Sequence, residues 1–271
     1  MTDVLVGRTE RGHDLLLHLG DSWHTALQGM SRSGKSVLTY ALLSGIARDP
    51  SVWVCGVDPT GILLNPWRDY PGSEFRHLGT SDMSEAAACL ERIVAEMDRR
   101  IAWLLAHDLD KVPEASPTLP LLLVVLEEYP GTLSAAEAED AASGVKKAEQ
   151  VAPRISRCVR RLVQEGAKAG VRLLLIAQRM DASIVGGAER SNLGTRITMR
   201  VDNLDAVRML HPTLPPERME QVSRFKPGVG LVERPGEPPT MFKADLLDYA
   251  AYVAYVRSCA PVACRPAEAV A

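Results

Sequence analysis

The chain has 271 residues, of which 46% are hydrophobic. This composition is typical of a globular protein with a sizeable core, and it excludes an intrinsically disordered chain. The formal net charge of −3 excludes a uniformly basic surface, so contacts with nucleic acid would require local clusters of Lys and Arg. The 5 cysteines follow no common zinc or redox spacing. No signal peptide or bilayer-length apolar run is visible, and we expect a cytoplasmic protein without a membrane segment of its own.

Short apolar runs open the chain and predict a lead-in of small strands over residues 1–24. A further strand is expected at residues 24–27. Over residues 36–48, apolar side chains recur near helical spacing and Pro50 follows, which predicts a helix that ends before this proline. A strand, a glycine-containing loop and a helix in this order point a helix N-terminus at a bound phosphate.

The loop between this strand and this helix fits the pattern G-x-x-x-x-G-K-[ST] of a phosphate-binding P-loop. Its backbone N–H groups would surround a phosphate, its lysine would add positive charge, and its serine hydroxyl would bind Mg²⁺. The motif predicts an ATP site at Gly29, Met30, Ser31, Arg32, Ser33, Gly34, Lys35 and Ser36. A surface loop rich in Gly and Ser is the alternative, and the flanking strand and helix argue against it.

The next predicted strand, at residues 51–57, ends at Asp58. An acid in this position either faces a ligand at the carboxyl edge of a sheet or caps the following turn, and the sequence favours neither. Residues 60–80 carry prolines and glycines and are expected to be irregular. Residues 84–107 predict a long amphipathic helix, with Ser81 or Ser84 as its N-cap.

Two adjacent acids follow the most apolar segment of the chain. Residues 121–126 predict a buried central strand, and Glu127 and Glu128 come directly after it. In a P-loop NTPase the first acid at such a strand end holds Mg²⁺ and a following glutamate can polarise the attacking water. The alternative interpretation is that Glu127 and Glu128 are ordinary surface acids. The P-loop upstream makes this alternative the weaker one.

A basic helix follows an acidic, small-residue segment at residues 135–143. Spacings of three and four place several arginines on one stripe of this helix, which could track a phosphate backbone. The candidate DNA-binding residues are Lys146, Lys147, Arg154, Arg157 and Arg161. Ion pairing with nearby acids explains the same stripe equally well.

The remaining elements begin with a buried strand at residues 171–177, which ends at Gln178. The side-chain amide of Gln178 would lie at the end of this strand, beside the strand that precedes the two acids, and could there sense a γ-phosphate. Further along, the sequence predicts a strand at 195–201, a helix at 204–210, a hairpin of 229–232 with 239–242, and a closing helix at 245–258.

The order of these segments resembles the motor domain of the FtsK/SpoIIIE DNA translocases, within the HerA/FtsK group of RecA-like ATPases. The resemblance covers most of residues 4–243. Besides the P-loop, it rests on His24 to Leu27, Val57-Asp58-Pro59, Glu96 to Arg100, Gln178-Arg179 and Thr195-Arg196-Ile197. It implies an α/β, RecA-like P-loop NTPase fold over residues 25–258, with a mostly parallel sheet, helices on both faces and a flexible tail at 259–271.

The resemblance also implies a homo-hexameric ring that hydrolyses ATP with Mg²⁺ and moves double-stranded DNA. In that family pattern Ser36 and Glu127 hold the metal, Glu128 is catalytic and Gln178 is the sensor. Arg196 is the expected finger that completes a neighbour's site, with Arg208 as a second candidate. Loops between residues 131 and 161 and around residues 181–190 would face the DNA.

The chain departs from the family pattern at two residues. Glu127 stands where the family usually has Asp, and Ala177 where it usually has Thr. Neither an N-terminal membrane region nor a winged helix is recognised in the sequence. In this respect the chain resembles the FtsK-like transfer proteins of actinobacterial plasmids or a phage relative. A membrane-bound partner could recruit such a protein. The alternatives are a motor for protein substrates, as in type VII secretion, and a slow nucleotide-binding assembly protein.

Overall fold

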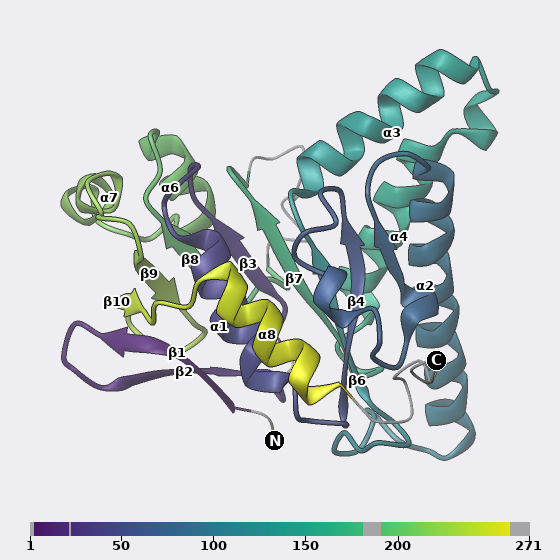
Figure 1. Ribbon diagram of the computed structural model, residues 1–271, viewed down its shortest axis with the longest axis horizontal. Helices are drawn as coiled ribbons and strands as arrows, with labels where there is room; N and C mark the ends of the chain where they lie inside the picture. Colours follow the sequence, from purple (N-terminus) through teal and green to yellow (C-terminus); the bar gives the residue numbers. More distant parts are fainter. Residues whose placement is uncertain (1–2, 22, 181–190, 261–271) are drawn as a thin grey trace, which may run out of the picture.

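The computed structural model describes residues 3–21, 23–180 and 191–260. They form one 10-stranded sheet in the order β2-β1-β10-β9-β8-β3-β7-β6-β4-β5, with helices on both faces (Figure 1). The predicted α/β fold with a mostly parallel sheet is therefore confirmed. The expected tail at 259–271 begins inside the last helix, and its residues 261–271 lie outside the described part.

One half of the sheet is entirely parallel, and its four inner strands are the buried apolar runs of the sequence. Side chains are covered on both faces, so the usual alternation of apolar and polar residues is lost. The strands are, in spatial order, β8 (Thr195–Met199), β3 (Thr25–Gln28), β7 (Val171–Ala177), β6 (Leu121–Leu126), β4 (Val52–Asp58) and β5 (Arg76–Leu78).

The other half is antiparallel and joins the two ends of the chain. β10 pairs with β1, so the strands predicted as a lead-in extend the same sheet. This half consists of β9 (Val229–Glu233), β10 (Thr240–Ala244), β1 (Asp3–Thr9) and β2 (Asp14–His18).

The helices cover the sheet in two layers. On one face α2 (Met83–Ala106), α3 (Tyr129–Ser143) and α4 (Val151–Glu165) pack over β4, β6 and β7. On the other face lie α1 (Lys35–Ile46) and α8 (Tyr249–Cys259). Near the antiparallel half, α6 (Leu204–Leu210) and α7 (Pro216–Ser223) cover a third, smaller apolar cluster. Short 3-10 turns occur at Asn65–Trp67, Ser73–Phe75 and Lys147–Glu149.

Some local expectations were wrong. Asp82, not a serine, caps α2, because its carboxylate accepts a hydrogen bond from the Glu85 N–H at 2.8 Å. Residues 60–80 contain β5, which is only three residues long and adds an edge to β4. The closing helix begins at Tyr249, four residues later than expected, where Asp248 caps it.

Candidate nucleotide-binding site

The parallel strands bring the predicted site residues to one edge of the sheet. β3, β7, β6 and β4 run in the same direction, so the segments that follow them meet at their carboxyl ends. The glycine loop follows β3, Gln178 follows β7 and the two glutamates follow β6. Because β7 lies between β3 and β6, Gln178 is placed between the glycine loop and the acids.

The loop of residues 29–34 is held by the ends of neighbouring strands. The Met30 N–H donates to the Arg200 carbonyl at 2.8 Å, and the Gly228 N–H donates to the Ser33 carbonyl at 2.8 Å. Gly34 has φ of 108°, and a Cβ there would lie 2.7 Å from the Gly228 nitrogen. A side chain is therefore excluded from this position both by backbone conformation and by space.

Lys35 begins α1 and turns its ammonium back over the loop. Its Nζ donates to the Gly29 carbonyl and, at 3.3 Å, to the Met30 carbonyl. Partial burial lowers the pKa of Lys35, and the charges of Glu128 and Glu127 oppose that shift. One cation and two carboxylates thus act on the same space beside the loop.

Glu127 is the most perturbed acid of this cluster. Burial, followed by the charge of Asp58 and a hydrogen bond to it, raises the pKa of Glu127 to about 8. Its Oε2 atom is buried without a hydrogen-bond partner. A buried carboxylate oxygen that lacks a donor is a ready ligand for a cation.

Asp58 is fully hydrogen-bonded within its own turn. Its carboxylate accepts from the Thr60 N–H and hydroxyl, from the Gly61 N–H and from the Leu64 N–H, all at 2.9–3.0 Å. The capping interpretation of Asp58 is therefore correct. The same carboxylate also lies against Glu127, so its cap adds negative charge to the site.

Glu128 adopts a backbone conformation that is unusual for a residue with a side chain. Its φ is 44°, in the left-handed region, and it forms the N-cap position of α3. Such strain persists only where surrounding structure imposes it, and it is common at functional sites. Because of this turn, Glu128 no longer continues the direction of β6, but the charge of Glu128 still acts on Lys35.

The oxygen atoms at this edge fit Mg²⁺. Within the described residues there is no group of three or more His, Cys, Asp or Glu side chains that could hold a metal by itself. Mg²⁺ usually takes one or two protein oxygens and completes its shell with phosphate and water. The Ser36 hydroxyl on the first turn of α1 and the unpaired Glu127 Oε2 are donors of the required kind.

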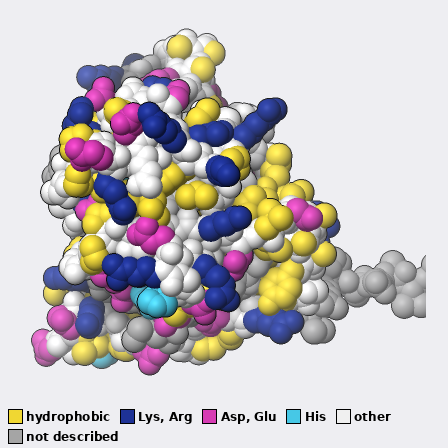
Figure 2. All heavy atoms as spheres, turned by 90° about the vertical axis from the view of Figure 1, so that its left-hand side faces the viewer, with side chains coloured by type: hydrophobic (Ala, Val, Ile, Leu, Met, Phe, Trp, Pro, Cys, Tyr) yellow, Lys and Arg dark blue, Asp and Glu magenta, His cyan; other side chains and the backbone are white. Residues whose placement is uncertain are grey.

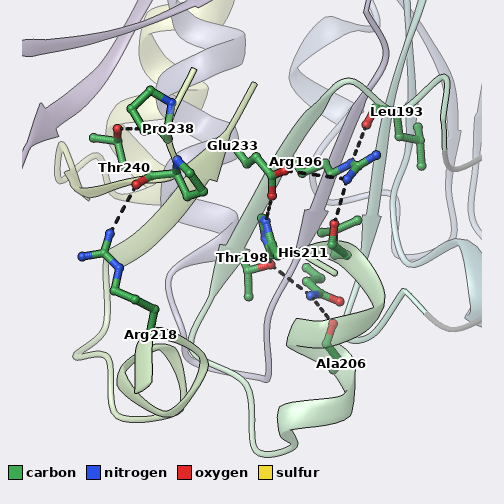
Figure 3. Close-up of polar contacts among 12 residues, drawn as sticks. Leu193, Arg196, Thr198, Ala206, His211, Arg218, Glu233, Pro238 and Thr240 are labelled. Atoms are coloured by element: carbon green, nitrogen blue, oxygen red, sulfur yellow. Dashed lines mark hydrogen bonds and ion pairs between the residues drawn. The ribbon is translucent and has the colours of Figure 1, made fainter. Parts of the chain in front are cut away.

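Arg196 lies away from this cluster in its own chain. It pairs with Ala26 in the register of β8 and β3, two residues before the end of β3. Its guanidinium donates to the carbonyls of Leu193 at 3.0 Å and Leu210 at 3.2 Å and lies 3.9 Å from Glu233 (Figure 3). Arg208 is more accessible, with a side chain 61% exposed that pairs with Asp205 at 2.6 Å.

The basic stripe on α4 divides into paired and exposed residues. Arg154 makes a two-bond ion pair with Glu91 of α2, and Arg161 does the same with Asp98 of α2. Ion pairing therefore accounts for these two arginines. Arg157 and the residues Lys146 and Lys147 are exposed. The other expected DNA-facing loop, at residues 181–190, lies outside the described residues.

A second group of basic side chains was not predicted from the sequence. Figure 2 shows Lys and Arg spread over the face formed by α7, β10 and the β1–β2 hairpin, with Asp and Glu between them. Arg8 and Arg224 in this region each pair with an acid within 3.4 Å. The mixed charge matches the near-neutral composition and gives no continuous basic surface there.

Sequence comparison finds DNA translocases. FtsK of Staphylococcus aureus (strain Mu50) is 24% identical over 221 residues, which cover 74% of this chain and 26% of that protein. FtsK of Halalkalibacterium halodurans is 24% identical over 220 residues, covering 74% and 25%. The chain thus spans about a quarter of the length of the curated relatives it matches. No family model matches it.

Structural comparison extends the likeness over nearly the whole chain. The pCW3 conjugation coupling protein TcpA, solved with ATPγS, superposes with a TM-score of 0.71 at 20% identity, covering 91% of this chain and 66% of that one. EccC of Thermomonospora curvata, solved with a signal sequence peptide, gives a TM-score of 0.70 at 16% identity, covering 95% and 47%. The resemblance to FtsK-type motor domains is therefore confirmed in sequence, and the chain has the fold of the RecA-like P-loop ATPases.

Proposed function

We propose that this chain is an ATP-hydrolysing motor domain that moves double-stranded DNA. The observation that carries the proposal is the position of Lys35, whose ammonium lies over the glycine loop and is acted on by the charges of Glu127 and Glu128. Relatives named DNA translocase and a fold shared with a conjugation coupling protein support the choice of DNA as cargo.

Each residue of this edge has a role in the proposed reaction. The loop N–H groups and Lys35 bind the phosphates, and the Ser36 hydroxyl and Glu127 hold Mg²⁺. The metal would supply positive charge that neutralises the phosphate oxygens. Glu128, set off from the strand by its left-handed turn, orients the attacking water, and Gln178 contacts the γ-phosphate from the tip of β7.

The proposed site is completed by a second copy of the chain in a homo-hexameric ring. Charge on the γ-phosphate oxygens needs a further cation, and an arginine supplied by a neighbour provides it. Arg196 is the first candidate, and it would have to exchange its bonds to Leu193 and Leu210 for the phosphate. Arg208 is the second candidate, and it is held by its exposed pair with Asp205.

The proposed DNA surface consists of Arg157 on α4 and the two lysines that precede this helix. Lys146, Lys147 and Arg157 would contact phosphates without reading base sequence, while Arg154 and Arg161 hold α4 on α2. Residues 25–258 would act as the motor unit, in the cytoplasm. None of the helices in the described ranges is both long and apolar enough to cross a membrane. A membrane-bound partner would recruit the motor.

The test is ATP hydrolysis with and without duplex DNA over a series of salt concentrations. We expect DNA to stimulate hydrolysis and the stimulation to fall as salt rises, because phosphate contacts release counterions. Lys35→Ala should abolish hydrolysis, while Lys111→Ala, an exposed lysine outside this edge, should leave it unchanged. Hydrolysis that is indifferent to DNA at low salt would show that DNA is not the cargo.

A motor for protein substrates is the second candidate, because the fold is equally close to that of EccC with a signal peptide. Stimulation of hydrolysis by a secreted peptide, with none by DNA, would favour it. Tight ATP binding without detectable single-turnover hydrolysis would instead indicate a slow assembly protein. The raised pKa of Glu127 is the feature that agrees with slow hydrolysis.

A further inference from the structure

A buried amide lies at the root of the glycine loop. Gln28 is the last residue of β3 and precedes Gly29, and its side chain is completely buried. Its Nε2 donates to the Thr198 hydroxyl at 3.0 Å and to the Ala206 carbonyl at 2.8 Å. Its Oε1 accepts from the Met180 N–H at 3.0 Å. One carboxamide therefore joins the ends of β3, β7 and β8 and the start of α6.

The three bonds allow only one orientation of this carboxamide. Reversing it would set the Oε1 atom against the Ala206 carbonyl and the NH₂ group against the Met180 N–H. Both contacts would be repulsive and would leave buried polar groups unpaired. Gln28 is thus held as a rigid link between the strand before the glycine loop and the segment that contains Gln178.

A line of hydrogen-bonded polar groups continues from Gln28 through β8. The Thr198 hydroxyl lies 2.8 Å from His211 Nε2, and His211 Nδ1 lies 2.5 Å from Glu233 Oε2 (Figure 3). Since a carboxylate only accepts, His211 donates from Nδ1 and accepts at Nε2 when neutral. Thr198 then donates to His211 and accepts from Gln28, so every group in the line is satisfied.

This line ends beside Arg196, the first candidate for contact with a neighbouring subunit. Glu233 accepts from His211 and lies 3.9 Å from the Arg196 guanidinium. Thr198, His211 and Glu233 are arranged like an acid–base–hydroxyl triad, but His211 and Thr198 are completely buried. With no access for a substrate, the arrangement serves to hold position.

We infer that Gln28 is a positioning residue for the nucleotide reaction: it fixes the glycine loop and the Gln178 tip relative to each other, and Thr198, His211 and Glu233 hold it in its one productive orientation. This inference rests on the proposed function. A small displacement of Gln178 from the phosphate would slow hydrolysis with little effect on nucleotide binding, because binding depends on the loop and Lys35.

The experiment compares Gln28→Met and Thr198→Val with the wild type. Direct binding of a fluorescent ATP analogue should change by no more than about threefold, while kcat for ATP hydrolysis should fall roughly tenfold to a hundredfold. Thr198→Ser, which keeps the hydroxyl, should restore kcat. Tyr70→Phe is the control, since it also removes a hydroxyl with two hydrogen bonds, to Ala47 and Val256 away from the loop.

Hydrogen exchange gives a second readout that does not need hydrolysis. In Gln28→Met the Met180 amide and the amides of residues 29–35 should exchange about tenfold faster or more, while those of β6 stay protected. Unchanged exchange in the loop would overturn the inference. Equal losses of nucleotide affinity and kcat in Gln28→Met and Thr198→Val would also overturn it. The same holds if the kcat of these variants is as high as that of Tyr70→Phe. A wild type that does not hydrolyse ATP would overturn the proposed function, and exchange would still decide the role of Gln28.

Discussion

At the scale of single residues, Glu127 should cost the nucleotide-free protein stability. Its pKa rises from 4.5 to about 8 on folding, so between these values the native state holds a proton that the unfolded chain has released. The free energy of unfolding therefore falls as pH rises through this range. Glu127→Gln removes this dependence, and we expect it to stabilise the protein at pH 8 by about 1–3 kcal/mol.

Urea or thermal unfolding at several pH values, without Mg²⁺ or nucleotide, checks this expectation. The gain should be small near pH 4.5 and largest at pH 8. Glu137→Gln, which removes an exposed acid of α3, should shift stability by less than about 0.5 kcal/mol at either pH. A gain that does not grow with pH would show that Glu127 is not held neutral by its surroundings.

From the sequence, candidate site residues could be named where they belong to a pattern with known chemistry. The glycine loop and Lys35 were proposed because they fit a motif of fixed spacing, and the two acids were proposed because they follow a buried strand downstream of that motif. The contact between Asp58 and Glu127 was not predicted, because it depends on the order of β4 and β6 in the sheet. Gln28 was missed because a glutamine at a strand end carries no signal until its partners, 152 and 170 residues away, are known.

At the scale of elements, the outward stripe of α4 should separate into two kinds of arginine. Arg157→Ala should weaken binding to duplex DNA at all sequences and reduce the slope of affinity against salt by about one. Arg154→Ala should leave DNA affinity almost unchanged and cost at most about 1 kcal/mol of stability, because its charge is already paired with Glu91 on a partly exposed surface.

Fluorescence anisotropy with a labelled duplex at four or five salt concentrations makes the comparison. Equal losses in the two variants would mean that Arg154 leaves Glu91 to bind DNA, and the division of the stripe would be wrong. If neither variant loses affinity for DNA, the DNA surface does not lie on α4. Circular dichroism of both variants checks that the ion pair with α2 does not control helix content.

Long periodic elements were predicted well, and the short helix α6 was predicted at its observed bounds, but β5 and α7 were not predicted. The α2 helix and strands β4, β6 and β7 lie within a few residues of their expected positions, since each buries a continuous apolar pattern. β5 and α7 have three and eight residues and are formed by their neighbours, so their own sequence carries little signal. α3 was read only as an acidic segment because its small residues give it no strong apolar face.

At the scale of the molecule, the sequence predicted a parallel sheet but not the order of its strands. That order places β7 between the loop-bearing β3 and the acid-bearing β6, and it seats β1 and β2 beside β10 at the far edge. The pairings of β3 with β7 and of β1 with β10 join segments separated by well over a hundred residues, and local patterns do not encode them. The resemblance to a known family supplied the fold where the residues alone could not.

The proposed ring predicts that each site needs two chains. Lys35→Ala lacks the phosphate-binding cation but offers an intact arginine, whereas Arg196→Ala offers an intact loop. Each variant alone should be inactive. In an equal mixture, a junction works only when the loop comes from the arginine variant and the arginine from the lysine variant, so activity should recover to roughly a quarter of wild type. Repeating the mixture with Arg208→Ala identifies which arginine acts in trans, because only the true one should show recovery. Wild-type activity of Arg196→Ala and Arg208→Ala, each assayed alone, would show that neither arginine completes a neighbour's site.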